Sequence, residues 1–183
     1  MLVGRDIECR RIDRLLEDAR EHRGAALVIR GDPGIGKSAL LRYAERHAKG
    51  MHVLRATGTE SDSELRFAAL TELLLPLLDV IETLPQAQRA ALLAAFAIGS
   101  VVPPSHLELQ TATLAALAKA ADGRPTLCLI DDAHWLDPVS YTHLTLPTNS
   151  CRGHSCAHRR ARVRTEEFRG TRSCRSHARR LEG

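Results

Sequence analysis

Gly31-Asp32-Pro33-Gly34-Ile35-Gly36-Lys37-Ser38 is the stretch that decides the fold of this 183-residue chain. It matches the pattern G-x-x-x-x-G-K-[ST] at every fixed position. Glycines let the backbone curl so that successive N–H groups point inward, and such a concave loop binds phosphate oxygens. In this pattern the lysine reaches the β- and γ-phosphates of a nucleotide, and the hydroxyl that follows it ligates Mg²⁺. The stretch therefore predicts a phosphate loop, with Lys37 on the phosphates and Ser38 on the metal.

The segments on either side of the loop agree with this interpretation. Ala25–Ile29 is a short, continuous apolar run, typical of a strand buried on both faces of a parallel sheet. Helical spacing of apolar residues predicts one helix over about residues 6–22 and another from the loop to about Ala48. Met51–Ala56 is the next predicted strand.

A long helical region comes next. Ser61–Glu64 has the pattern of a capping box, which predicts the start of a leucine-rich helix. Pro76 lies inside that helical pattern and should kink or split the helix, because proline lacks the N–H that a helix interior needs. Pro85 predicts the start of another helix, and Ser105–Glu108 is a second capping box that should open a further one.

Two adjacent carboxylates follow the third predicted strand, Thr126–Ile130. An apolar strand that ends in an acid delivers a carboxylate to the sheet edge beside the phosphate loop. We expect Asp131 to hold Mg²⁺, and Asp132 to orient or deprotonate the attacking water as the catalytic residue. Strands and helices alternate along residues 1–138, which predicts an α/β fold: the three-layer, parallel sheet of a P-loop NTPase.

The character of the sequence changes at residue 139. Residues 1–138 carry 16 Lys+Arg and 19 Asp+Glu, a net charge of −3, whereas residues 139–183 carry 10 Arg and 3 Glu, a net charge of +7. The pI near 9.0 therefore belongs to the tail alone. The tail has too few large apolar side chains to offset its ordering entropy. We expect residues 139–183 to be disordered, and the sheet to be incomplete because only three strands are readable.

Five segments of the chain together resemble one family. They are Leu2–Arg5, Leu27–Leu41, Phe67–Leu70, Leu74–Leu78 and Asp131–Asp137. Residues 1–138 resemble the AAA/STAND ATPase domain at the front of large bacterial LuxR-type transcriptional regulators. The stretch from Ser140 to Thr148 resembles a segment that recurs at the ends of unrelated predicted proteins, so we interpret the tail as read-through that is not native.

The resemblance implies ATP and Mg²⁺ as ligands and a slow ATP-driven switch as the function. The expected phosphate-binding positions are consecutive: Gly31, Asp32, Pro33, Gly34, Ile35, Gly36, Lys37, Ser38 and Ala39. Val3, Gly4 and Arg5 correspond to the family's adenine contacts. His134, Trp135 and Asp137 form a recurrent segment after the metal-site strand, in which we expect Trp135 to serve packing.

The resemblance also suggests partners and limits. DNA would be bound only through a C-terminal helix-turn-helix, which residues 1–183 do not include, and self-association belongs to the intact family. No apolar run reaches the ~18 residues of a membrane span, so we expect a cytoplasmic protein. The chain should bind ATP and hydrolyse it negligibly. Two alternatives stay open, a P-loop phosphotransferase and nonspecific nucleic-acid binding through the arginines of the tail.

Overall fold

The computed structural model describes residues 4–60, 67–96, 104–137, 140 and 162–167, and the structural statements below concern these residues. The strands are β1 (Ala25–Arg30), β2 (His52–Thr57), β3 (Thr126–Asp131) and β4 (Arg162–Glu167). The helices are α1 (Asp6–Arg20), α2 (Lys37–His47), α3 (Ala68–Leu74), α4 (Leu78–Glu82), α5 (Gln86–Ala95) and α6 (His106–Ala120). Two short 3₁₀ helices are η2 (Leu75–Leu77) and η3 (Ala133–Trp135).

The strands form two parallel pairs. β2 pairs with β3 from His52 opposite Thr126 to Thr57 opposite Asp131. β1 pairs with β4, so that Ala25 lies opposite Arg162. We expected no further strand beyond Pro138, and for residues 162–167 that expectation is wrong. Backbone hydrogen bonds hold a strand in a ladder whatever its side chains are, so a segment without an apolar run can still pair with β1. Ser140, also in the predicted disordered tail, is described as well and is buried. The predicted disorder of the other tail residues concerns residues outside the described ones.

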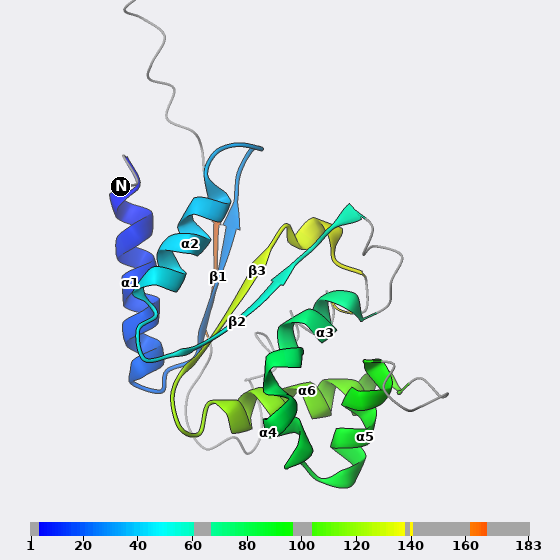
Figure 1. The fold of residues 1–183 in the computed structure, drawn as a ribbon. Coiled ribbons are helices and arrows are strands. Elements are labelled where there is room, and N and C mark those ends of the chain that lie inside the picture. Colours follow the sequence, from blue (N-terminus) through cyan, green and yellow to red (C-terminus); the bar gives the residue numbers. More distant parts are fainter. Residues whose placement is uncertain (1–3, 61–66, 97–103, 138–139, 141–161, 168–183) are drawn as a thin grey trace, which may run out of the picture.

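Helices cover both faces of the β2–β3 pair (Figure 1). α1 and α2 pack on one face through a cluster that also includes Leu129 of β3 and, at its margin, Val53 of β2. On the other face α3 to α6 pack through a larger cluster that includes Leu54 of β2. Because successive side chains of a strand point to opposite faces, neighbours Val53 and Leu54 join different clusters. The fold is therefore the predicted three-layer α/β arrangement.

The helix boundaries follow from local signals in the sequence. The leucine-rich pattern breaks at Pro76, which lies in η2 between α3 and α4. α6 begins at a complete capping box: the Ser105 N–H donates to Glu108 Oε2 (2.9 Å), and the Glu108 N–H donates to Ser105 Oγ (3.3 Å). Both signals were predicted, and both are confirmed.

The start of the leucine-rich helix differs from the prediction. Ser61–Glu64 lies outside the described residues, but Phe67 precedes α3 with a φ of 67°. This left-handed conformation is unfavourable for a side chain with a Cβ, and it interrupts any helix that would run through it. The prediction of one helix continuing from the capping box into α3 is therefore wrong. The Phe67 side chain is buried in the larger cluster, and this burial offsets the backbone cost.

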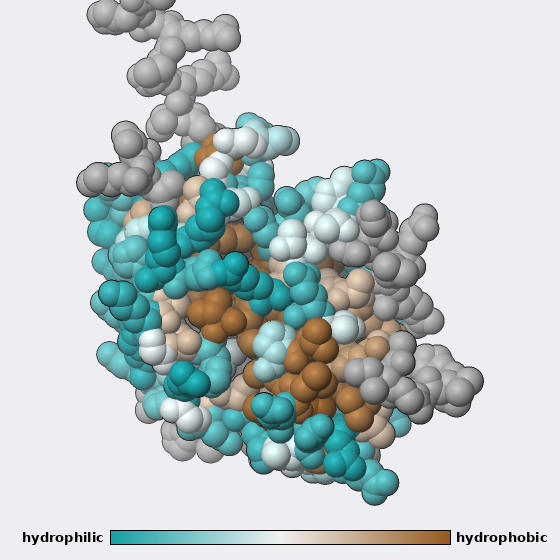
Figure 2. Space-filling view, in the orientation of Figure 1, coloured by the Kyte–Doolittle hydropathy of each residue, from teal (hydrophilic) through white to brown (hydrophobic). Residues whose placement is uncertain are grey.

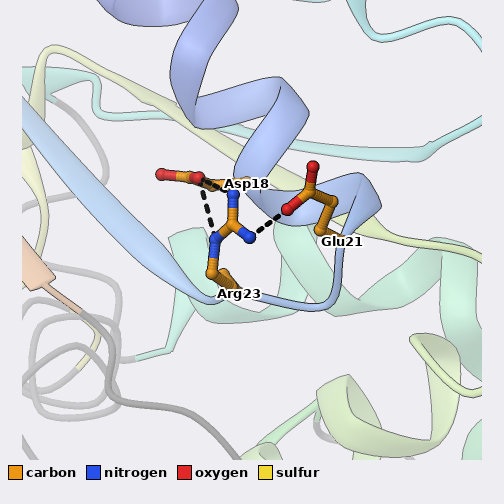
Figure 3. Close-up of polar contacts among 3 residues, drawn as sticks. All are labelled: Asp18, Glu21 and Arg23. Carbon is orange, nitrogen blue, oxygen red and sulfur yellow. Dashed lines mark hydrogen bonds and ion pairs between the residues drawn. The ribbon is translucent and has the colours of Figure 1, made fainter.

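An ion-pair cluster closes the turn between α1 and β1 (Figure 3). The Arg23 guanidinium lies between two carboxylates, those of Asp18 and Glu21, and its Nε donates to Asp18 Oδ1 at 2.9 Å. The Arg23 N–H also donates to the Asp18 carbonyl at 2.7 Å. The turn thus joins α1 to the phosphate-loop strand through side-chain and backbone contacts to the same residue.

An apolar area lies on the face of the molecule seen in Figure 2. Figure 2 shows hydrophobic residues gathered in the region of α3 and α4, where Leu75 of η2 is 47% exposed. Within the described ranges, no helix has both the length and the apolar character needed to cross a membrane.

Candidate functional site

The phosphate loop connects the carboxyl end of β1 to the amino end of α2 (Figure 1). Two of its glycines have left-handed backbone conformations, Gly34 with φ 78° and Gly36 with φ 99°. Only glycine adopts such conformations without a steric penalty. The fixed glycine of the motif at Gly36 is therefore required by the turn that starts α2, of which Gly36 is the N-cap.

Lys37 folds back over the loop. Its ammonium donates to the carbonyl oxygens of Gly31 (3.0 Å) and Asp32 (3.1 Å). A lysine ammonium has three donors, so one remains for a ligand once these two bonds are formed. The loop backbone thus holds a cation at its centre with free hydrogen-bonding capacity.

Backbone donors lie beside this cation. Among the described residues, no group accepts a hydrogen bond from the N–H of Gly36, Lys37 or Ser38. These N–H groups belong to the first turn of α2, where the helix dipole is positive. Free amides at a helix start, together with an ammonium, fit the oxygens of a phosphate group.

The amino-terminal segment reaches the loop through Arg5. Its Nη2 donates to the Ile35 carbonyl at 2.8 Å, and its Nη1 pairs with Glu8 Oε1 at 3.3 Å. Gly4 precedes it with φ 73°, and Val3 lies outside the described residues. The structure therefore brings Arg5 to the phosphate loop, a contact that the sequence did not indicate. Whether Val3, Gly4 and Arg5 touch adenine stays a prediction.

Asp131 is the last residue of β3, and Asp132 follows it. The carboxyl ends of β1 and β3 lie on the same side of the molecule, so the phosphate loop and this turn begin at the same end of the strands (Figure 1). Asp131 Oδ1 accepts the Asp132 N–H at 3.0 Å. Asp132 has a left-handed φ of 47°, and its carbonyl accepts the Trp135 N–H at 2.9 Å, which closes the turn into η3. Among the described residues, no hydrogen bond or ion pair joins either carboxylate to the loop.

No sequence pattern pointed to three residues that support this turn. The Gly58 N–H donates to the Asp131 carbonyl at 3.0 Å, which ties the end of β2 to the end of β3. Glu72 of α3 accepts the Thr57 N–H at 2.9 Å. These contacts join positions far apart in the chain, so no local pattern predicted them. A glycine directly after a strand was the only available signal.

A buried polar chain lies behind the same turn. Asp137 is 1% exposed, and its Oδ1 accepts the N–H of Ser140 at 2.9 Å. Ser140 Oγ in turn accepts the Leu70 N–H of α3 at 3.2 Å. Trp135, by contrast, is 37% exposed and contacts His134 with ring centroids 5.1 Å apart. Within the recurrent segment, Asp137 is thus linked to α3 through Ser140, whereas the Trp135 side chain is partly exposed.

Metal binding at this site would require ligands beyond side chains. In the described part of the chain, no three His, Cys, Asp or Glu residues gather as a metal cluster. Mg²⁺ is usually held by one or two protein ligands together with substrate phosphates and water. The donor set of one hydroxyl, Ser38, and one carboxylate, Asp131, has the chemistry for that mode of binding.

Comparison with protein-family models shows the family of this chain. Neither a curated protein nor a solved structure matches the chain. A family model does match it: the model described as an AAA ATPase domain covers residues 1–146. That span includes the phosphate loop, the two carboxylates at the end of β3 and all helices described above. Such a domain implies nucleotide binding, typically with Mg²⁺. The chain therefore belongs to the AAA ATPase domain family.

Proposed function

We propose that this chain binds ATP with Mg²⁺ and serves as the regulatory switch module of a transcriptional regulator of the STAND, LuxR-type class. The free amides of the α2 start beside the Lys37 ammonium are the observation that carries the binding proposal. The resemblance of residues 1–138 supports the regulatory class.

Each loop residue would have a separate role. Lys37 would hold the β- and γ-phosphates, and the backbone from Gly31 to Ala39 would surround them with N–H donors. Ser38 and Asp131 would hold Mg²⁺, which neutralises phosphate charge when bound. Asp132 would orient the attacking water or take its proton.

The switch part of the proposal is supported by the ties between α3 and the carboxylate turn. Asp131 accepts a bond from Gly58, and the preceding residue, Thr57, bonds to Glu72 of α3. Leu70 of α3 bonds to Ser140, just after the turn. A shift of the turn on nucleotide binding would therefore move the start of α3. This predicts that ATP changes hydrogen exchange in α3, and that the change is absent in Lys37→Ala.

Two carboxamide variants test the assigned metal and catalytic roles. Asp131→Asn should weaken ATP binding in Mg²⁺ by about tenfold and leave binding in EDTA nearly unchanged, because a metal ligand is lost. Asp132→Asn should leave binding intact under both conditions and lower only the rate of any turnover. Asp122→Asn, an exposed carboxylate in the turn before the amino end of β3, is the matched control. If Asp131→Asn and Asp132→Asn behave alike in both titrations, the division of roles is wrong.

A further inference from the structure

Arg5 makes a contact with the phosphate loop that adenine binding does not require. Its guanidinium side chain is 20% exposed and spans 30 positions in sequence to reach the Ile35 carbonyl at 2.8 Å. The other terminal nitrogen of the same guanidinium, Nη1, pairs with Glu8 Oε1 on the first turn of α1. Arg5 is therefore held on α1 while it binds the loop.

The Ile35 carbonyl shares its peptide unit with the Gly36 N–H. In a planar trans peptide the C=O and the N–H point in opposite directions, and the described residues contain no cis peptide bond. Holding the carbonyl toward Arg5 therefore directs the Gly36 N–H to the other side of the loop. That N–H is one of the free donors at the start of α2.

This peptide unit would otherwise rotate easily. Gly36 has no Cβ, and its φ of 99° lies in a region where glycine moves freely. Gly34, on the other side of Ile35, also has a left-handed φ. A hydrogen bond from a charged donor is roughly twice as strong as a neutral one, so the Arg5 contact is the main restraint on this peptide from outside the loop.

The loop carbonyls are divided between two cations. Lys37 binds the carbonyls of Gly31 and Asp32, and Arg5 binds that of Ile35. The Ile35 oxygen thus lies on the side of its peptide opposite the Gly36 N–H, so it does not compete with that donor for an incoming anion.

We propose that Arg5 is a positioning residue of the phosphate loop, which orients the Gly36 N–H toward the phosphates by holding the Ile35 carbonyl. The identity of the ligand rests on the proposed nucleotide binding, whereas the effect of Arg5 on the orientation of the loop does not. This contact would affect every phosphate-bearing ligand alike, because it lies on the loop.

The first measurement needs no nucleotide. The N–H groups of Ala39 and Leu40 both donate to the Gly36 carbonyl, at 3.1 and 3.2 Å, so their hydrogen exchange reports on the Gly36 position. Arg5→Ala should speed exchange at both amides about tenfold, the effect of one charged hydrogen bond. Arg10→Ala, which changes an exposed arginine of α1, should leave exchange at both amides unchanged. Unchanged exchange in Arg5→Ala, with an unchanged melting temperature, overturns the inference.

The second measurement separates the loop from the base. Inorganic tripolyphosphate, ATP and GTP are titrated against the wild type, Arg5→Ala and Arg5→Lys with Mg²⁺ present. An equal loss of affinity for all three probes in Arg5→Ala, about tenfold, supports a role on the loop. Arg5→Lys should recover part of the affinity, because lysine keeps the charge but lacks the two-pronged guanidinium. A loss for ATP alone identifies an adenine contact and overturns the inference. If the wild type binds no probe while exchange still rises in Arg5→Ala, the proposed nucleotide binding fails and the positioning role stands.

Discussion

Gly58→Ala should damage the carboxylate turn more than any other conservative change near it. A Cβ at this position would lie 2.4 Å from the Asp132 carbonyl oxygen, and 3.1 Å from both the Leu136 nitrogen and the Trp135 carbonyl carbon. All three are backbone atoms, so no side-chain rotation relieves the clash. The end of β2 must move away from the turn, which also stretches the bond from the Gly58 N–H to the Asp131 carbonyl.

The expected cost follows from these two effects. Overpacking of this kind costs about 1–3 kcal/mol, and a weakened backbone hydrogen bond adds about 1 kcal/mol. A total of about 2–4 kcal/mol is a large part of the ~5–15 kcal/mol that stabilises an ordinary domain. For a chain of this size the melting temperature should fall by roughly 5–15 °C.

Thermal unfolding followed by circular dichroism measures this loss. Gly123→Ala is the matched control, because a Cβ there meets nothing within 4 Å. That variant should melt within about 2 °C of the wild type, or slightly above it, since alanine restricts the unfolded chain. If Gly58→Ala and Gly123→Ala have the same melting temperature, the close approach of β2 to the carboxylate turn is refuted.

Two further predictions concern capping groups. Hydrogen bonds from Ser105 lower the pKa of Glu108 below its ordinary 4.5, so the carboxylate stabilises α6 above that pH and its contribution is lost as the pH falls through the lowered value. At pH 7 the wild type should have a higher melting temperature than Glu108→Gln, and this difference should disappear at low pH. A difference that stays constant with pH would contradict the assignment. Asp137→Ala should cost about 1–3 kcal/mol in urea unfolding because it leaves the buried Ser140 N–H without its acceptor. Asp137→Asn keeps an acceptor and should cost clearly less, so equal losses would show that the capping bond is unimportant.

Much of the fold was predictable because its signals are local. The continuous apolar run before the phosphate loop predicted β1, and the structure extends it by one residue to Arg30. Pro76 marked the break between α3 and α4, since a missing N–H acts on the helix that contains it. The Ser105–Glu108 box marked the start of α6 for the same reason: donor and acceptor lie within one turn.

The missed features depend on contacts between distant parts of the chain. β4 has the sequence Arg-Val-Arg-Thr-Glu-Glu and no apolar run, so only its pairing with β1 identifies it as a strand. No sequence pattern reports the left-handed φ of Phe67 or the burial of its side chain. The bond from Arg5 to Ile35 was equally invisible, although both residues were named as candidate ligands. The sequence indicated candidate site residues, and the structure adds the contacts that Arg5, Lys37 and Asp131 make.

Calorimetric titration of Mg²⁺–ATP into the wild type and Lys37→Ala tests the central claim most directly. Lys37 is the side-chain cation of the loop, and its ammonium already lies on the Gly31 and Asp32 carbonyls, where it would meet the β- and γ-phosphates. Saturable binding by the wild type is expected, with affinity at least tenfold weaker in Lys37→Ala, a difference of about 1.4 kcal/mol. Equal affinities for the two proteins, or no binding by a folded wild type, would contradict the assignment of Gly31–Ser38 as the phosphate site.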